Sequence, residues 1–145
     1  MATDVQVEQR IGRPRAEVAA YVTDWRNDPT WIKALSDVRL LSEPPLRVGS
    51  RVERVANFRG RTIEYVNEVA ALEPDSRLEM KAVDGPFPMS VVYEFADAGE
   101  GTLVRIHARG DATGFYRLVG PVLSRAVKRT IAADLKRLKK VLEQA

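Results

Sequence analysis

The chain has 145 residues, 45% of them hydrophobic and 30% charged, a length that fits one domain spanning residues 1–145 with a full core. No apolar run approaches the roughly 20 residues that cross a bilayer, and no signal peptide is recognisable, so we expect a soluble cytoplasmic protein without a membrane span. Because the chain has no cysteine and one histidine, His107, disulfides, thiol nucleophiles and cysteine-based zinc sites are excluded, and we predict no metal and no cofactor.

The net charge of +3 is unevenly distributed along the chain. From Arg117 onward, eight Lys or Arg stand against Asp134 and Glu143, so the rest of the chain is net negative. Such asymmetry occurs in proteins that contact nucleic acid or membranes, but more often it marks the solvated face of an amphipathic helix. We favour the solvated face, which makes nucleic acid the disfavoured partner.

The first third of the chain predicts a strand and two short helices. Apolar and polar residues alternate over Val5–Ile11, which is the period of a half-buried strand. A proline is well placed in the first turn of a helix, so we expect a helix over Pro14–Thr23. Asp24 is placed to cap a second short helix, which is interrupted near Asp28-Pro29 and reaches Leu35.

The middle of the chain predicts strands, and its end predicts one long helix. Short apolar or alternating runs separated by turn residues indicate six more strands, over 38–41, 51–58, 61–72, 77–83, 90–96 and 102–110. The tail has apolar residues at helical spacing, and we expect this helix to start or kink at Pro121. A helix of about 25 residues is long enough to cover the apolar face of a seven-stranded antiparallel sheet. The sheet should therefore curl around the helix and leave a space between them.

The central hairpin predicts which side chains face that space. Arg59-Gly60 is typical of a two-residue hairpin loop, with the glycine at positive φ. Such a loop sets Arg54 opposite Tyr65 and Val52 opposite Asn67, and opposed residues share a face of the sheet. Three carboxylates lie on the opposite face, which we therefore expect to meet water. The face that carries Arg54 and Tyr65 should point inward.

Arg54, Tyr65 and Asn67 are thus placed on an otherwise apolar inner wall. A buried guanidinium must be paired, either with a protein carboxylate or with an anionic ligand. Two alternatives stay open: Arg54 extends to the rim, or a β-bulge turns it outward. Tyr65 and Asn67 are equally well explained as core polar residues with their hydrogen bonds satisfied.

The same alternation extends the predicted wall to other strands. It turns His107 toward solvent, which argues against a catalytic role for it, and it leaves no carboxylate or histidine facing inward as a strong base. The predicted ligand-binding residues are Trp31, Arg54, Phe58, Ile63, Tyr65, Asn67, Met80, Val91, Tyr93 and Ile106.

A diffuse set of residues spread over nearly the whole chain forms one pattern: Arg13-Pro14, Val18, Tyr21, Val22, Asp24, Asn27, Pro29, Trp31, Val48-Gly49, Phe58-Arg59-Gly60-Arg61, Glu68-Val69, Gly101-Thr102, Leu135–Lys139 and Glu143. This pattern resembles the polyketide cyclase/dehydrase branch of the START-like (SRPBCC, Bet v 1-like) superfamily. The resemblance implies an α+β helix-grip fold: an antiparallel sheet of about seven strands, two short helices after the first strand, a long C-terminal helix and an apolar ligand cavity. Members of the superfamily include aromatase/cyclases, lipid and sterol carriers and hormone receptors.

Three functions are compatible with these observations. The favoured one is binding of a hydrophobic, lipid-like or aromatic small molecule in the cavity. The second is a cyclase, aromatase or dehydratase, with Arg54, Tyr65 and Asn67 as catalytic candidates. The third is a module that contacts RNA, the ribosome or a membrane through the basic C-terminal helix, which lacks the interleaved aromatic residues of single-strand binders. A homodimer is left open.

Overall fold

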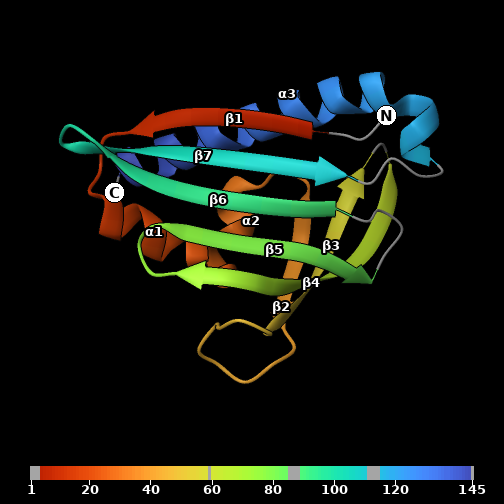
Figure 1. Ribbon diagram of the computed structural model, residues 1–145, viewed down its shortest axis with the longest axis horizontal. Helices are drawn as coiled ribbons and strands as arrows, with labels where there is room; N and C mark the ends of the chain where they lie inside the picture. The colour runs from red at the N-terminus through yellow and green to blue at the C-terminus, as the bar shows by residue number, and fades with distance from the viewer. Residues whose placement is uncertain (1–3, 59, 85–88, 111–114, 145) are drawn as a thin grey trace.

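The computed structural model describes residues 4–58, 60–84, 89–110 and 115–144, with the side chains of residues 58, 61 and 115–124 left outside the description. Seven strands and three α-helices, together with one short 3-10 helix, make up this part of the chain (Figure 1). In chain order they are β1 (Asp4–Ile11), α1 (Arg15–Thr23), η1 (Trp25–Asn27), α2 (Asp28–Trp31), β2 (Leu35–Leu40), β3 (Arg51–Phe58), β4 (Arg61–Glu73), β5 (Arg77–Asp84), β6 (Met89–Ala98), β7 (Gly101–Gly110) and α3 (Phe115–Glu143).

The strands form one antiparallel sheet in the order β1-β7-β6-β5-β4-β3-β2. Consecutive strands are neighbours except β1, which pairs with β7 and so brings the two ends of the strand region together. The helix α3 packs along β1 and runs behind β1 and β7 in Figure 1. This is the predicted α+β helix-grip fold.

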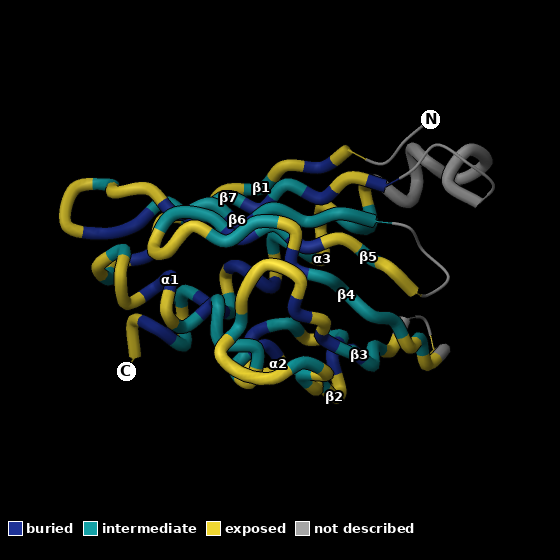
Figure 2. Tube along the Cα trace, turned by 60° about the horizontal axis from the view of Figure 1, so that its bottom comes forward, coloured by how far each residue is buried: buried dark blue, intermediate teal, exposed yellow. Residues whose placement is uncertain are grey.

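The predicted register of the central hairpin is confirmed. Arg54 pairs with Tyr65 and Val52 with Asn67 between β3 and β4, without a bulge. Gly60 has a φ of 80°, a value that glycine adopts at no steric cost, while Arg59 lies outside the described residues. Strand alternation also holds in β1 and β7, along which buried residues can be followed in Figure 2, whereas the register shifts twice between β4 and β5.

The helical segment after β1 is shorter than expected. Asp24 accepts a hydrogen bond from the Arg26 amide at 3.1 Å, as a capping residue does, but helix α2 ends at Trp31. The backbone turns extended at Ile32, and Leu35 opens β2 instead of ending the helix, three residues before the strand predicted from Val38. A register shift between Leu35 and Asp37 against β3 hides the period-2 pattern of β2, which explains why alternation missed its first residues.

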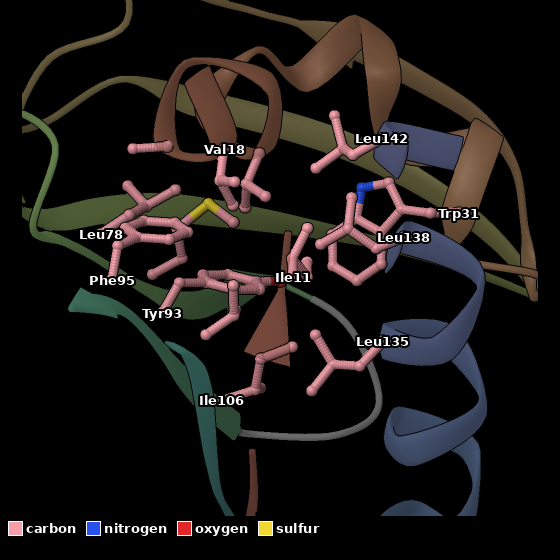
Figure 3. Packing of buried hydrophobic residues seen from close by; sticks show 14 of the residues in the cluster. Ile11, Val18, Trp31, Leu78, Tyr93, Phe95, Ile106, Leu135, Leu138 and Leu142 are labelled. Carbon is pink, nitrogen blue, oxygen red and sulfur yellow. The ribbon is translucent and has the colours of Figure 1, made fainter. Parts of the chain in front are cut away.

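The helix α3 closes the core with an apolar stripe. It begins at Phe115, before the start considered at Pro121. Leu135, Leu138 and Leu142 are buried and point toward strand residues such as Tyr93 and Phe95 (Figure 3). Among the described residues, no helix is long and apolar enough to span a membrane.

If the leucine stripe holds α3 to the sheet, Leu138→Ala lowers the free energy of unfolding by about 2–5 kcal/mol, because Leu138 is fully buried and its removal leaves a cavity. Urea denaturation measures the change. Lys140→Ala, an exposed site on the same helix, is the control and changes stability by less than about 0.5 kcal/mol. Equal effects of the two substitutions would contradict the role of the stripe.

Candidate functional site

A pocket of about 300 Å³ lies between the inner face of the sheet, the segment around α2, and α3. We call it the main pocket. Its apolar lining is Trp31, Ile32, Ala34, Leu35, Ala56, Ile63, Ala82, Met89, Val91, Ile106, Ala108, Val127 and Ile131. Its polar lining is Arg54, Tyr65, Asn67, Tyr93, Thr130 and Asp134.

Side-chain size explains why the space is open at this end of the molecule. Large residues fill the other end, where Leu138, Leu142 and Phe95 belong to the close-packed cluster seen in Figure 3. Along the pocket, the strands instead carry alanines at Ala56, Ala82 and Ala108. Small side chains facing the helix leave volume that no neighbouring residue fills.

The main pocket includes most of the residues that the sequence placed on the inner wall. Of the ten predicted, eight line it: Trp31, Arg54, Ile63, Tyr65, Asn67, Val91, Tyr93 and Ile106. The side chain of Phe58 lies outside the described part of the structure. Met80 is buried and lines a separate cavity of about 10 Å³, where its Sδ lies 3.9 Å from Arg54 Nη2. Arg54 lines both spaces, and parity along a strand cannot tell which of them a neighbouring residue faces.

Arg54 is buried and paired with a carboxylate of the protein itself. Its Nη1 lies 2.7 Å from Oδ2 of Asp28, the first residue of α2, and both side chains are about 5% exposed or less. The alternatives of an exposed rim position or an outward bulge are therefore wrong. From the sequence, Asp28-Pro29 is recognisable only as a helix interruption, because Asp28 and Arg54 are brought together only by the packing of α2 against the sheet.

Burial governs the ionisation of the groups around Arg54. It raises the pKa of Asp28 to about 6, against the lowering effect of the Arg54 guanidinium. It also raises the pKa of the Tyr65 and Tyr93 hydroxyls above their ordinary value, again with Arg54 opposing. At neutral pH the pair is ionised and both phenols keep their protons, so they are hydrogen-bond donors.

A second buried carboxylate, Asp134, reaches the main pocket from α3. Its Oδ1 accepts hydrogen bonds from Arg137 Nη1 at 3.0 Å and from the Lys33 amide at 3.3 Å, and burial raises its pKa. The expectation that no carboxylate faces inward is thus wrong. A signal was present in the sequence, since Asp134 lies three residues after Ile131 and four before Leu138, on the apolar stripe.

His107 lies on the opposite face of the sheet from the pocket. It occupies β7 between the buried residues Ile106 and Ala108, and its Nε2 contacts Oδ1 of Asp4 at 2.5 Å. The predicted outward orientation is confirmed. Among the described residues, no cluster of three or more acidic, histidine or cysteine side chains is arranged to hold a metal ion.

Residues 2–143 match the family model described as polyketide cyclase / dehydrase and lipid transport. The chain belongs to this family. No curated protein matches the sequence. The comparison with solved structures agrees with the architecture described above.

Three solved structures illustrate the likeness. The protein TTHA0849 from Thermus thermophilus has a TM-score of 0.83 at 20% identity, covering 98% of this chain and 99% of that one. The Zhui aromatase/cyclase from Streptomyces has a TM-score of 0.82 at 16% identity, with 99% and 95% covered. A START superfamily protein from Mycobacterium smegmatis has a TM-score of 0.82 at 14% identity, with 97% of both chains covered. At these identities the likeness establishes the fold.

The buried pair predicts a large effect of removing its cation. Arg54→Met lowers the free energy of unfolding at neutral pH by about 3–5 kcal/mol, because it leaves the Asp28 carboxylate buried without a counter-charge. Arg39→Met, which breaks the exposed pair with Glu53, is the control and costs less than about 1 kcal/mol. Chemical denaturation of both variants measures the difference, and similar small losses would show that the burial of the pair has no energetic weight.

Stability should also depend on pH through Asp28. The folded protein holds the Asp28 proton more tightly than the unfolded chain, with a pKa of about 6 against an ordinary 3.8, so this group favours folding at low pH. That contribution is complete below the unfolded pKa and is lost as pH rises through about 6. Relative to Asp28→Asn, the wild type therefore loses about 2–3 kcal/mol of unfolding free energy between pH 4 and pH 7. Parallel pH profiles of the two proteins in urea denaturation would contradict this.

Proposed function

We propose that the whole chain acts as one domain that binds a hydrophobic small molecule, aromatic or lipid-like, in the main pocket. The observation that carries the proposal is the pocket itself: about 300 Å³ of space with a mostly apolar lining and a few convergent polar groups. This is the usual composition of a small-molecule site. The family description, which includes lipid transport, supports the same interpretation.

The polar groups of the pocket have hydrogen-bonding capacity to offer a ligand. The described residues provide no hydrogen bond to the hydroxyls of Tyr65 and Tyr93 or to the amide of Asn67. Arg54 Nε is likewise buried without a partner. A ligand that buries apolar surface against the alanine-lined wall gains the hydrophobic term, and these groups then orient it.

A cyclase or dehydratase is the second candidate, and one observation favours it. Tyr65, protonated at neutral pH, and Asp134, ionisable and buried, line the same pocket and offer an acid and a base. In such a reaction Arg54 would hold a developing oxyanion and Asn67 would orient a carbonyl. Recovery of bound ligand after incubation separates the functions, since a carrier returns it unchanged and an enzyme returns a product.

The third hypothesis, contact with RNA or a membrane, rests on the basic face of α3. Arg125, Lys128, Arg129, Lys136 and Lys140 are exposed, and Lys139 is half-buried and paired with Glu143 at 2.5 Å. No aromatic residue interleaves with them over residues 125–144. The solvated-face interpretation accounts for this charge without a partner.

The pocket proposal is tested by filling the space. The neutral fluorophore N-phenyl-1-naphthylamine should bind the wild type at one site with an increase in fluorescence. Ala56→Phe should weaken this binding by at least about tenfold, because the added ring occupies the pocket. Val55→Phe adds the same ring to the neighbouring position on the other face and is the matched control. Binding that survives Ala56→Phe, or fails equally in both variants with their folds intact by circular dichroism, would overturn the proposal.

A further inference from the structure

The charges around the main pocket balance in pairs. Among the described lining residues, Arg54 and Asp134 are the charged ones. Each has a counter-charge next to it, because Asp28 lies 2.7 Å from Arg54 and Arg137 lies 3.0 Å from Asp134. The pocket therefore has donors and acceptors but no net charge.

Asp28 neutralises the charge of Arg54, although it does not itself line the main pocket. It lines the small cavity, which Arg54 also lines, so a ligand in the main pocket meets Arg54 while Asp28 lies outside the lining of that pocket. The Arg54 side chain is held by its contact with Asp28; its Nη2 lies 3.9 Å from Met80 Sδ, and its Nε is buried without a protein partner.

An anionic ligand would find little compensation here. Transfer of a carboxylate from water into a low-dielectric pocket is costly unless an uncompensated cation receives it. The charge of Arg54 is already neutralised by Asp28 and that of Asp134 by Arg137, so the described lining residues offer a carboxylate no uncompensated cation. An uncharged acceptor such as a ketone loses much less hydration and can still accept from Arg54 and Tyr65.

We propose that Asp28 is a specificity-determining residue, which makes the pocket select uncharged apolar ligands over carboxylates of the same shape. This inference rests on the proposed ligand-binding function and adds the charge class of the ligand. Asp28 acts through Arg54 and touches no ligand, so it is a positioning residue. Removal of the Asp28 carboxylate should leave the charge of Arg54 uncompensated and shift the ligand preference from uncharged molecules toward anions.

Two probes of one skeleton test the proposal: 2-acetonaphthone, which is neutral, and 2-naphthoate, which is anionic. At slightly alkaline pH, where Asp28 and naphthoate are both ionised, calorimetric titration of the wild type should give at least about tenfold tighter binding of the ketone. In Asp28→Asn, the ratio of ketone affinity to naphthoate affinity should fall by at least about tenfold. The fall should come from stronger naphthoate binding, while the ketone affinity stays within about twofold of the wild-type value.

Asp24→Asn is the matched control, because it removes a carboxylate from the same segment that pairs with the exposed Arg26. It should leave the ratio unchanged. Asp28→Ser provides a second neutral variant if the asparagine variant does not fold, and Asp134→Asn should raise naphthoate affinity independently. Naphthoate binding as tight as that of the ketone in the wild type, or an unchanged ratio after neutralising Asp28, would overturn the inference and leave ligand binding intact. Binding of neither probe would instead overturn the proposed function on which it rests.

Discussion

The buried ion pair between Arg54 and Asp28 is the interaction on which the pocket depends. It joins β3 to the first residue of α2, and it lies between the small cavity and the main pocket, both of which Arg54 lines. Two apolar side chains of similar volume could fill this place at no greater cost in stability, because desolvation offsets the attraction within a buried pair. The ion pair provides a polar side chain, Arg54, at a fixed position in an apolar wall, and the Asp28 carboxylate neutralises its charge.

The helix α3 has two distinct roles along its length. Its C-terminal leucines fill the concave face of the sheet and supply apolar contact with Trp31 and the strand residues around it. Nearer its start, Val127 and Ile131 face the alanine-bearing strands and leave the pocket open. Asp134 lies where the two parts meet, tied to Arg137, which also donates to the backbone oxygen of Trp31 at 2.9 Å. The close-packed C-terminal part of α3 thus fixes the position of the part of the helix that lines the main pocket.

The fold followed from the sequence because its signals are local. The hairpin register depends on the Arg59-Gly60 pair and on strand parity, and both act over a few residues, so Arg54, Tyr65 and Asn67 were placed on the inner wall correctly. Asp28 and Asp134 were missed because their positions depend on contacts across the chain. Their burial arises only when α2 and α3 dock on the sheet, and a carboxylate in a helical segment is ordinarily expected to face water. Strand parity placed Met80 in the interior, but it could not show that Met80 lines the smaller of the two spaces that Arg54 lines.

The central claim is that a ligand occupies the space between the sheet and α3, against Arg54. Isoleucine methyl groups report on it directly, because Ile32, Ile63, Ile106 and Ile131 line the main pocket, whereas Ile11 is fully buried elsewhere in the core. In a methyl-labelled sample with 2-acetonaphthone, nuclear Overhauser contacts from the ligand to the four pocket isoleucines, with none to Ile11, are the result this account predicts. Contacts confined to other methyl groups would contradict it.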